Sequence, residues 1–142
     1  MSPAPVVAVG AIVRRDHEVL LVLRGTPPNE NQWAIPGGRL NLGETLQQGA
    51  EREILEETGL HIKAGEVVFT FEHIERNHGG TVLFHYVVLD LAAEYLSGEP
   101  RAGDDAREAC WIPLAQLEQW PINQTTLQAL RQLFPETVRV SH

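Results

Sequence analysis

GRLNLGETLQQGAEREILEETGL, residues Gly38 to Leu60, contains a predicted helix with an excess of acidic side chains. Thr45 and Gln48 fit a capping box at its start, and Gly59 is suited to the position that ends it. Like charges four residues apart repel, and acidic groups near a helix C-terminus oppose the helix dipole. Arg52 is the only basic residue among the acids Glu51, Glu53, Glu56 and Glu57. Another component must therefore stabilise these acidic side chains.

Three of these glutamates are predicted to share one helix face. Glu53, Glu56 and Glu57 follow the i, i+3, i+4 pattern, which places them within about a third of the circumference. Clustered carboxylates are typical ligands of Mg²⁺, with Mn²⁺ as a substitute, and such ions polarise phosphoryl oxygens and activate water. A solvated acidic face is the alternative, but a Pro-Gly-Gly turn and a terminal glycine accompany the spacing. Glu51 is expected to face away and lie on the surface.

Two other helix positions bear on how the acids are held. Arg52 precedes Glu56 by four residues, so an ion pair is expected to fix that carboxylate in one rotamer. Gly49 precedes Glu53 by one turn, and a glycine inside a helix costs about 1 kcal/mol relative to alanine. Its small size leaves room for the close approach of either a metal-bound phosphate or the preceding loop.

The whole chain sets broader limits. Its 142 residues suit a single domain, 1–142, with a core that needs no disulfide. The balance of 11 Lys and Arg against 19 Asp and Glu gives a net charge of −8, which argues against a polynucleotide or membrane partner. Cys110 is the only cysteine, and Arg14 interrupts the apolar N-terminal stretch too early for a membrane span. A cytoplasmic protein is expected.

Outside the acidic helix, predicted strands and helices alternate. Apolar and β-branched runs predict strands at 6–13, 19–23, 67–74, 81–91 and 109–112, with a short extended piece at 33–38. The first run is nearly continuous in apolar residues, as in a strand buried on both faces. Helical spacing marks 114–120 and 125–134, and 94–105 has the composition of the longest surface loop. These elements predict an α/β fold in which helices enclose a mixed sheet.

The acidic segment matches the signature of the Nudix hydrolases position for position, so the chain resembles that family. The matching residues are Gly38, Glu44, Arg52, Glu53, Ile54, Glu56, Glu57, Gly59 and Leu60. The resemblance extends loosely over 6–117. It implies an α/β/α sandwich with a central mixed β-sheet and hydrolysis of nucleoside diphosphates linked to another moiety.

The resemblance also implies roles for individual residues. Glu53, Glu56 and Glu57 would be metal ligands, and Glu44 would support the metal site. The carbonyl of Gly38 would contribute a further oxygen. Arg52, in the middle of the signature, would orient the carboxylates.

Two segments outside the signature bear on the substrate. LFHYVVLDL, residues 83–91, and SGEPRAGDDAREACWIPL, residues 97–114, resemble the bacterial ADP-ribose pyrophosphatase-like group. In many members of that family this region supplies another carboxylate near the metals. Glu108 is the candidate extra ligand or general base, with an exposed strand-edge acid as the alternative reading. Asp104 and Asp105 are the second choices.

Arginines and aromatic residues supply candidates for substrate binding. Arg24 and Arg76 are candidates for contact with a diphosphate, although ordinary salt bridges are an equal alternative. Trp33 and Phe71 are candidate base-stacking surfaces, although aromatic residues more often belong to the core. His73 is expected to be structural or exposed, with a catalytic role as the lesser alternative.

These observations favour a Mg²⁺-dependent pyrophosphohydrolase in which metal-activated water cleaves a phosphoanhydride of a small nucleotide, of the ADP-ribose or nucleotide-sugar type. One alternative is an enzyme that releases pyrophosphate from nucleoside triphosphates. Another is a nucleotide-sensing domain without catalysis. The sequence leaves open a homodimer whose interface completes the pocket.

Overall fold

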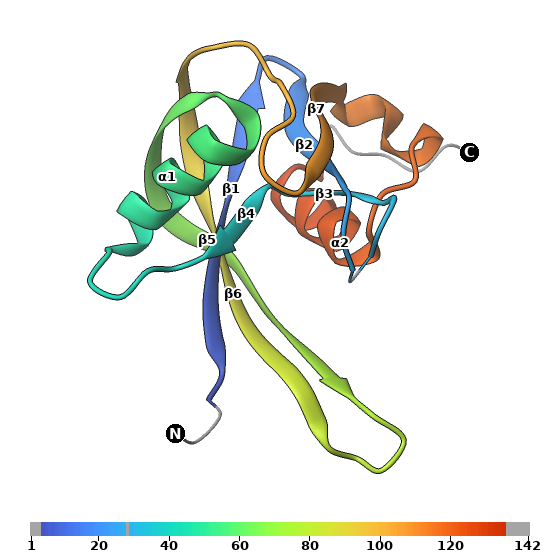
Figure 1. The fold of residues 1–142 in the computed structure, drawn as a ribbon. Coiled ribbons are helices and arrows are strands. Elements are labelled where there is room, and N and C mark those ends of the chain that lie inside the picture. Colours follow the sequence, from blue (N-terminus) through green and yellow to red (C-terminus); the bar gives the residue numbers. More distant parts are fainter. Residues whose placement is uncertain (1–3, 28, 136–142) are drawn as a thin grey trace.

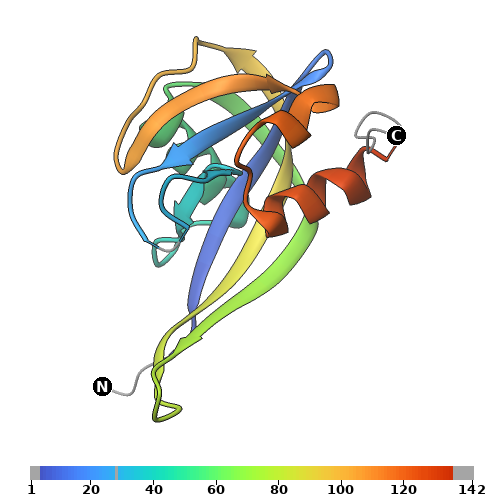
Figure 2. The ribbon, with the colours of Figure 1, turned by 90° about the vertical axis from the view of Figure 1, so that its right-hand side faces the viewer.

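A seven-stranded mixed sheet organises the computed structural model, which describes residues 4–27 and 29–135. The strands run in the order β3-β2-β1-β6-β5, while β4 pairs with β1 and β7 pairs with β2. Helix α1 covers one face, and helix α2 with the 3₁₀ helix η1 lies on the other (Figures 1 and 2). The predicted α/β/α sandwich is therefore confirmed. The elements are β1 Val6–Arg15, β2 Glu18–Arg24, β3 Trp33–Ala34, β4 Gly37–Arg39, α1 Leu46–Thr58, β5 His61–Arg76, β6 Val82–Ser97, β7 Ala106–Pro113, η1 Leu114–Gln119 and α2 Gln124–Leu133.

Strand β1 is the centre of the fold. It runs parallel to β6 and antiparallel to β2 and β4. Val9, Ala11 and Val13 pack in the core on the α1 side, whereas Ile12 packs in the core on the α2 side. Because successive side chains of a strand point to opposite faces, one apolar run contributes to both cores. The prediction of a strand buried on both faces is confirmed.

Helix α1 begins and ends where the sequence indicates. The Thr45 hydroxyl accepts a hydrogen bond from the Gln48 backbone at 3.1 Å, and the Gln48 side chain accepts one from the Thr45 backbone at 3.0 Å. Gly59 ends the helix at φ 78°, a conformation that glycine adopts without penalty. A Cβ at Gly49 would meet Leu40. The preceding loop, through Leu40, approaches the helix there.

The structure corrects several predicted boundaries. Strand β5 begins directly after α1 and β6 continues to Ser97, so the predicted loop 94–105 shrinks to 98–105. Ile62 and Ala64 are buried between exposed neighbours, which is the alternation of a half-buried strand. Segment 114–119 is a 3₁₀ helix, in which the buried residues Leu114 and Leu117 lie one turn apart on the same side.

The β5–β6 hairpin extends well beyond the two helical layers (Figures 1 and 2). Its outer part exposes apolar side chains, including Ile74, Val82 and Leu83. None of the helices in the described part of the chain has the length and apolar character needed to span a bilayer.

Candidate active site

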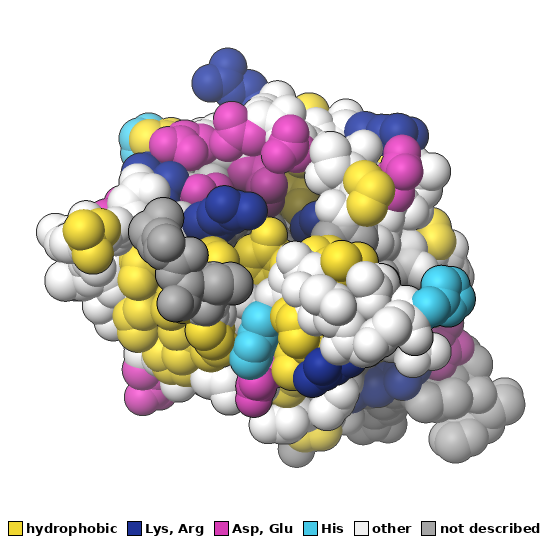
Figure 3. Space-filling view, turned by 60° about the horizontal axis from the view of Figure 1, so that its bottom comes forward, with side chains coloured by type: hydrophobic (Ala, Val, Ile, Leu, Met, Phe, Trp, Pro, Cys, Tyr) yellow, Lys and Arg dark blue, Asp and Glu magenta, His cyan; other side chains and the backbone are white. Residues whose placement is uncertain are grey.

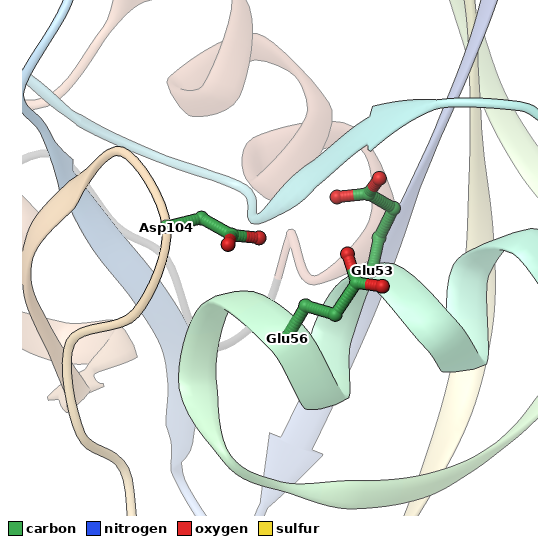
Figure 4. A group of neighbouring side chains, drawn as sticks. All are labelled: Glu53, Glu56 and Asp104. Carbon is green, nitrogen blue, oxygen red and sulfur yellow. The ribbon is translucent and has the colours of Figure 1, made fainter.

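Three carboxylates converge beside the N-terminal end of the pocket-lining strand β4. Glu53 and Glu56 come from α1, and Asp104 comes from the loop before β7 (Figure 4). One oxygen of each residue lies within 4.8 Å of the others. Asp104 has a φ of 49°, in the left-handed region, where Asp is one of the few residue types other than glycine that occur regularly. The fold thus gathers acids from segments about 50 positions apart in the sequence, as the numbering of the chain shows.

Arg52 holds the two helix members of this group, Glu53 and Glu56, in place. Its guanidinium donates to both Glu44 oxygens at 2.6 and 2.9 Å, to Glu53 at 2.8 Å, to Glu56 at 3.3 Å and to the Arg39 carbonyl at 2.9 Å. The hydrogen bonds from Arg52 lower the pKa of Glu44 to about 2, and those same bonds raise the pKa of Arg52. The predicted pair with Glu56 forms, but the shortest contact is with Glu44. Arg52 therefore orients several carboxylates at once.

The donor set fits a divalent cation. Glu53, Glu56 and Asp104 supply hard oxygen ligands, and oxygens that coordinate one Mg²⁺ or Ca²⁺ ion lie within roughly 5 Å of one another. A Cβ on Gly38 would overlap the Glu53 carboxylate, so the backbone there lies directly against this acid. Burial is the main cause that raises the pKa of Glu53, and the charges of Glu56 and Asp104 add to it. A cation would relieve that repulsion.

Glu57 and Glu44 lie just outside the converging group. Glu57 accepts a hydrogen bond from the Gly37 backbone at 3.1 Å. Its burial raises its pKa to about 7, although the Gly37 hydrogen bond and the charge of Arg24 oppose the rise. Glu44 is engaged by Arg52 and by the Asn41 backbone at 2.8 Å. These two acids therefore flank the group that converges.

A pocket of about 770 Å³ opens beside these acids, a volume typical of ligand sites. Figure 3 shows acidic side chains gathered with basic ones along one rim of a hollow in this face. The far walls come from strands β1, β5 and β6 and from the start of α2. The lining includes Gly10, Arg24, Gly38, Arg39, Glu53, Glu57, Phe71, His73, Tyr86, Asp90, Asn123 and Thr126.

Of the four residues predicted for substrate binding, two line the pocket and two do not. Arg24 and Phe71 line the pocket. Trp33 does not: it is 5% exposed and packs edge to face against Trp120, with ring centroids 5.3 Å apart. Arg76 lies at the outer end of the hairpin, where its guanidinium donates to the Gly80 carbonyl at 3.1 Å. Trp33 therefore follows the alternative of core packing, whereas Arg76 makes a backbone hydrogen bond instead of the salt bridge named as its alternative.

Glu108 is also placed away from the converging acids. It is exposed on β7, opposite Leu23 of β2, and it neither lines the pocket nor joins the carboxylate group. Asp104, named as a second choice, occupies that place because the loop before β7 turns back over α1. Glu51, expected on the surface, instead accepts a hydrogen bond from the Ala64 backbone at 2.9 Å. That bond satisfies a backbone group beside an irregularity in β5.

Two pocket residues differ from expectation: His73 was expected to be structural or exposed, and Asp90 was not predicted as a site residue. His73 lines the pocket, stacks on Phe84 with centroids 5.4 Å apart, and has a buried Nε2 without a partner in the described part of the chain. Asp90 lines the pocket and is 3% exposed. The available signal for Asp90 was a single charge inside the apolar run 86–93.

The pKa values of Glu57 and Asp90 predict that the protein loses stability as the pH rises in the absence of divalent cations. Both pKa values rise to about 7, from 4.5 and 3.8, and burial is the main cause. The folded state then binds more protons than the unfolded state, so the stabilisation is complete below about pH 4 and is lost through about pH 7. The low pKa of Glu44 acts only below this window.

We expect the free energy of unfolding to fall by about 5 kcal/mol between pH 5 and pH 8, because each of the two groups contributes roughly 2.5 kcal/mol over this range. Urea unfolding in EDTA at the two pH values measures this difference, and Asp90→Asn should reduce it. A free energy of unfolding that stays constant or increases over this range would contradict the assignment of these buried acids.

Comparison with known proteins identifies the family. The family model of the NUDIX domain matches residues 4–133. The chain is 37% identical to an ADP-ribose pyrophosphatase of Methanocaldococcus jannaschii over 113 residues, which are 80% of this chain and 64% of that protein. It is 29% identical to the oxidized purine nucleoside triphosphate hydrolase of Mus musculus, over 78% of this chain and 69% of that protein.

Solved structures agree. The NUDIX domain of Shewanella oneidensis NrtR, solved in complex with ADP ribose, superposes with a TM-score of 0.71 and 25% identity, over 93% of this chain and 88% of that one. The chain therefore belongs to the NUDIX domain family, as the signature at residues 38–60 indicates. It spans somewhat less than two thirds of the length of the archaeal relative.

Proposed function

We propose that this chain hydrolyses a phosphoanhydride bond in a nucleoside diphosphate derivative of the ADP-ribose or nucleotide-sugar type, with Mg²⁺ as its cofactor. The observation that carries the proposal is the convergence of Glu53, Glu56 and Asp104 at one rim of a pocket of about 770 Å³. The archaeal relative is named an ADP-ribose pyrophosphatase, and the NrtR domain was solved with ADP ribose. Both names support the substrate class.

The side chains divide the chemical work. Glu53, Glu56 and Asp104 would hold the cation, which supplies neutralisation of phosphate charge and polarisation of a phosphoryl oxygen. Arg52 keeps Glu53 and Glu56 in position through its hydrogen bonds. Arg24, at the end of β2, lines the pocket and would contact phosphate oxygens.

Glu57 is the candidate proton acceptor. Its Oε1 is engaged by the Gly37 backbone, which leaves Oε2 for a water molecule in the pocket. A carboxyl whose pKa lies near neutrality can take a proton from the attacking water and release it after the reaction. Attack breaks one P–O bond of the diphosphate, and the second phosphate leaves with the bridging oxygen. Phe71, which lines the same pocket, offers an apolar surface to the rest of the ligand.

A second candidate is the release of pyrophosphate from nucleoside triphosphates. It is favoured by the mouse relative, whose name specifies an oxidized purine nucleoside triphosphate. The two activities differ in their products: ADP-ribose yields AMP and ribose 5-phosphate, whereas a triphosphate yields a nucleoside monophosphate and pyrophosphate. The same carboxylates would serve either reaction. A sensing domain without catalysis is disfavoured because the full acidic group is present.

A product-resolved screen tests the proposal. Nucleotide sugars, dinucleotides and nucleoside triphosphates are incubated with the protein and with Mg²⁺ or Mn²⁺, and the products are separated by ion-exchange chromatography. We expect AMP or another nucleoside monophosphate from a diphosphate-linked substrate. Faster release of pyrophosphate from triphosphates would select the second candidate. Absence of any cleavage would remove the enzymatic proposal.

Removal of the cation should abolish turnover and lower stability together. A ligand that binds only the folded state stabilises it by about 2.7 kcal/mol at 100 times its dissociation constant. Saturating Mg²⁺ should therefore raise the unfolding temperature measured after EDTA treatment, and EDTA should stop the reaction. Glu56→Gln should show a smaller Mg²⁺-dependent rise. An equal rise in wild type and Glu56→Gln would place the cation elsewhere.

A further inference from the structure

Asp90 is a buried acid of the pocket, and it lacks a side-chain partner among the residues that the structure describes. It lies in the middle of β6, is 3% exposed and lines the cavity. Its neighbours Leu89 and Leu91 pack in the core on the α1 side, so the Asp90 side chain points to the opposite, α2 side of the sheet. The pocket lies on that side, between the sheet and the start of α2. Asp90 therefore reaches the floor of the pocket from below.

The Asp90 carboxyl has no hydrogen-bond or ion-pair partner among residues 4–27 and 29–135. Burial is the sole cause that raises its pKa to about 7. A buried polar group without a partner costs free energy, and almost all such groups in proteins are satisfied. Above its pKa, the charge of Asp90 is therefore poorly solvated in the empty protein. A ligand in the pocket would supply the missing partner.

The backbone opposite Asp90 is shaped around its carboxyl. Gly10 of β1 is directly paired with Asp90 in the sheet. A Cβ at position 10 would lie 2.5 Å from Asp90 Oδ1 and 2.9 Å from the Pro36 carbonyl oxygen, closer than real Cβ contacts. Glycine is required there because a Cβ would meet the fixed Pro36 carbonyl, and the Asp90 carboxyl uses the same free space beside β1.

The sheet register places Asp90 at a useful distance from the proposed cation site. Asp90, Gly10 and Gly37 lie opposite one another on β6, β1 and β4. Neighbouring strands are about 4.8 Å apart, so the Asp90 backbone lies roughly 10 Å from that of Gly37, while the Asp90 carboxyl leans over Gly10 of the strand between them. The Gly37 backbone binds Glu57, beside the acids that face the phosphates. A nucleotide with its phosphates at that rim would extend its nucleoside half over Asp90.

We propose that Asp90 is a specificity residue that accepts a hydrogen bond from an O–H or N–H group in the nucleoside half of the substrate. The inference rests on the proposed function for the identity of the ligand as a nucleotide. The donor belongs either to a ribose hydroxyl or to an amino group of the base, both of which offer the same chemistry to a carboxyl. Phe71 and Tyr86 line the same pocket and would flank the bound group.

Binding of AMP in the presence of Mg²⁺ tests this role, because AMP has no phosphoanhydride to be cleaved. Isothermal titration calorimetry compares wild type with Asp90→Asn and Asp90→Ala. Glu94→Gln, an acid-to-amide change at an exposed position of the same strand, is the control. Loss of a hydrogen bond to a charged group corresponds to roughly a 10- to 100-fold loss of affinity. We expect that loss in Asp90→Ala, a smaller one in Asp90→Asn, and none in the control.

Ligand analogues identify the donor. The arms of the experiment use 2′-deoxy-AMP, 3′-deoxy-AMP and purine riboside 5′-monophosphate, which lacks the amino group. The analogue that lacks the recognised donor should bind wild type as weakly as AMP binds Asp90→Ala, and it should lose nothing further in that variant. If the affinity loss caused by the analogue and the loss caused by Asp90→Ala add for every analogue, direct recognition by Asp90 is overturned.

Stability separates recognition from a structural role. Because the empty protein carries an unpartnered buried acid, both Asp90 variants should unfold at an equal or higher temperature than wild type at pH 8. Variants that lose affinity and stability together would overturn the proposal, as would unchanged AMP affinity in folded variants. Failure of the proposed function gives a different result: wild type would bind AMP in an Asp90-dependent way but cleave no diphosphate.

Discussion

Glu56→Gln is expected to lower kcat by at least about 10³-fold while the protein stays folded. Removal of one preorganised group that stabilises transition-state charge typically costs 10²- to 10³-fold, and loss of a cation ligand also weakens the cation itself. The Glu56 carboxylate faces Glu53 and Asp104, and its side chain is 46% exposed. The amide is isosteric but carries no charge. Little of the core is touched, so the fold should survive.

The measurement combines steady-state kinetics with circular dichroism and a Mg²⁺ titration. Glu66→Gln, an exposed acid on β5, is the matched control and should retain wild-type turnover. Glu53→Gln should behave like Glu56→Gln, because its carboxylate belongs to the same group. A Glu56→Gln protein that keeps more than a tenth of the wild-type kcat would remove this residue from the reaction.

The acidic helix was predictable because its information is local. Its capping box, its final glycine and the spacing of its acids are all set within 23 consecutive residues, Gly38 to Leu60. The central strand β1 was predictable for a similar reason, since its apolar run is filled on both faces. The ends of β5 and β6 were not. The residues that lengthen these strands near α1 include Lys63 and Glu94, which are polar and exposed. These residues belong to the strands only because β5 and β6 pair with each other there.

The rest of the site depends on contacts between distant segments. Nothing near Asp104 in the sequence distinguishes it from Asp105 or Glu108, and only the path of the 98–105 loop brings it to α1. Asp90 lies on β6, and its carboxyl lies against Gly10, 80 positions away in the numbering. Trp33 had two readings, and its packing against Trp120 placed it in the core. The spacing of residues in the sequence therefore predicts which side chains share one face of a helix, but not which residues of other segments pack against that face.

Arg52→Ala is expected to lower both stability and activity, because one guanidinium neutralises several acids. Its side chain is 26% exposed and contacts Glu44, Glu53 and Glu56. Hydrogen bonds to charged groups contribute about 1.5–3 kcal/mol each, and partial exposure reduces that figure. A loss of about 3 kcal/mol in the free energy of unfolding is expected in EDTA. Because the carboxylates would no longer be oriented, kcat should fall by about 10²-fold.

Three comparisons make this result specific. Arg107→Ala removes an exposed arginine that donates to Glu30 at 2.9 Å and to Asn31 at 2.6 Å, and it should cost less than about 1 kcal/mol. Arg52→Lys keeps the charge but cannot bridge several carboxylates in fixed directions, so it should fall between wild type and Arg52→Ala. Saturating Mg²⁺ should restore part of the stability of Arg52→Ala, because a cation among the same acids replaces the missing positive charge. One result would contradict this explanation: Arg52→Ala has the same free energy of unfolding as Arg107→Ala, and Mg²⁺ does not stabilise it. Arg52 and the cation would then not act by relieving repulsion among the acids.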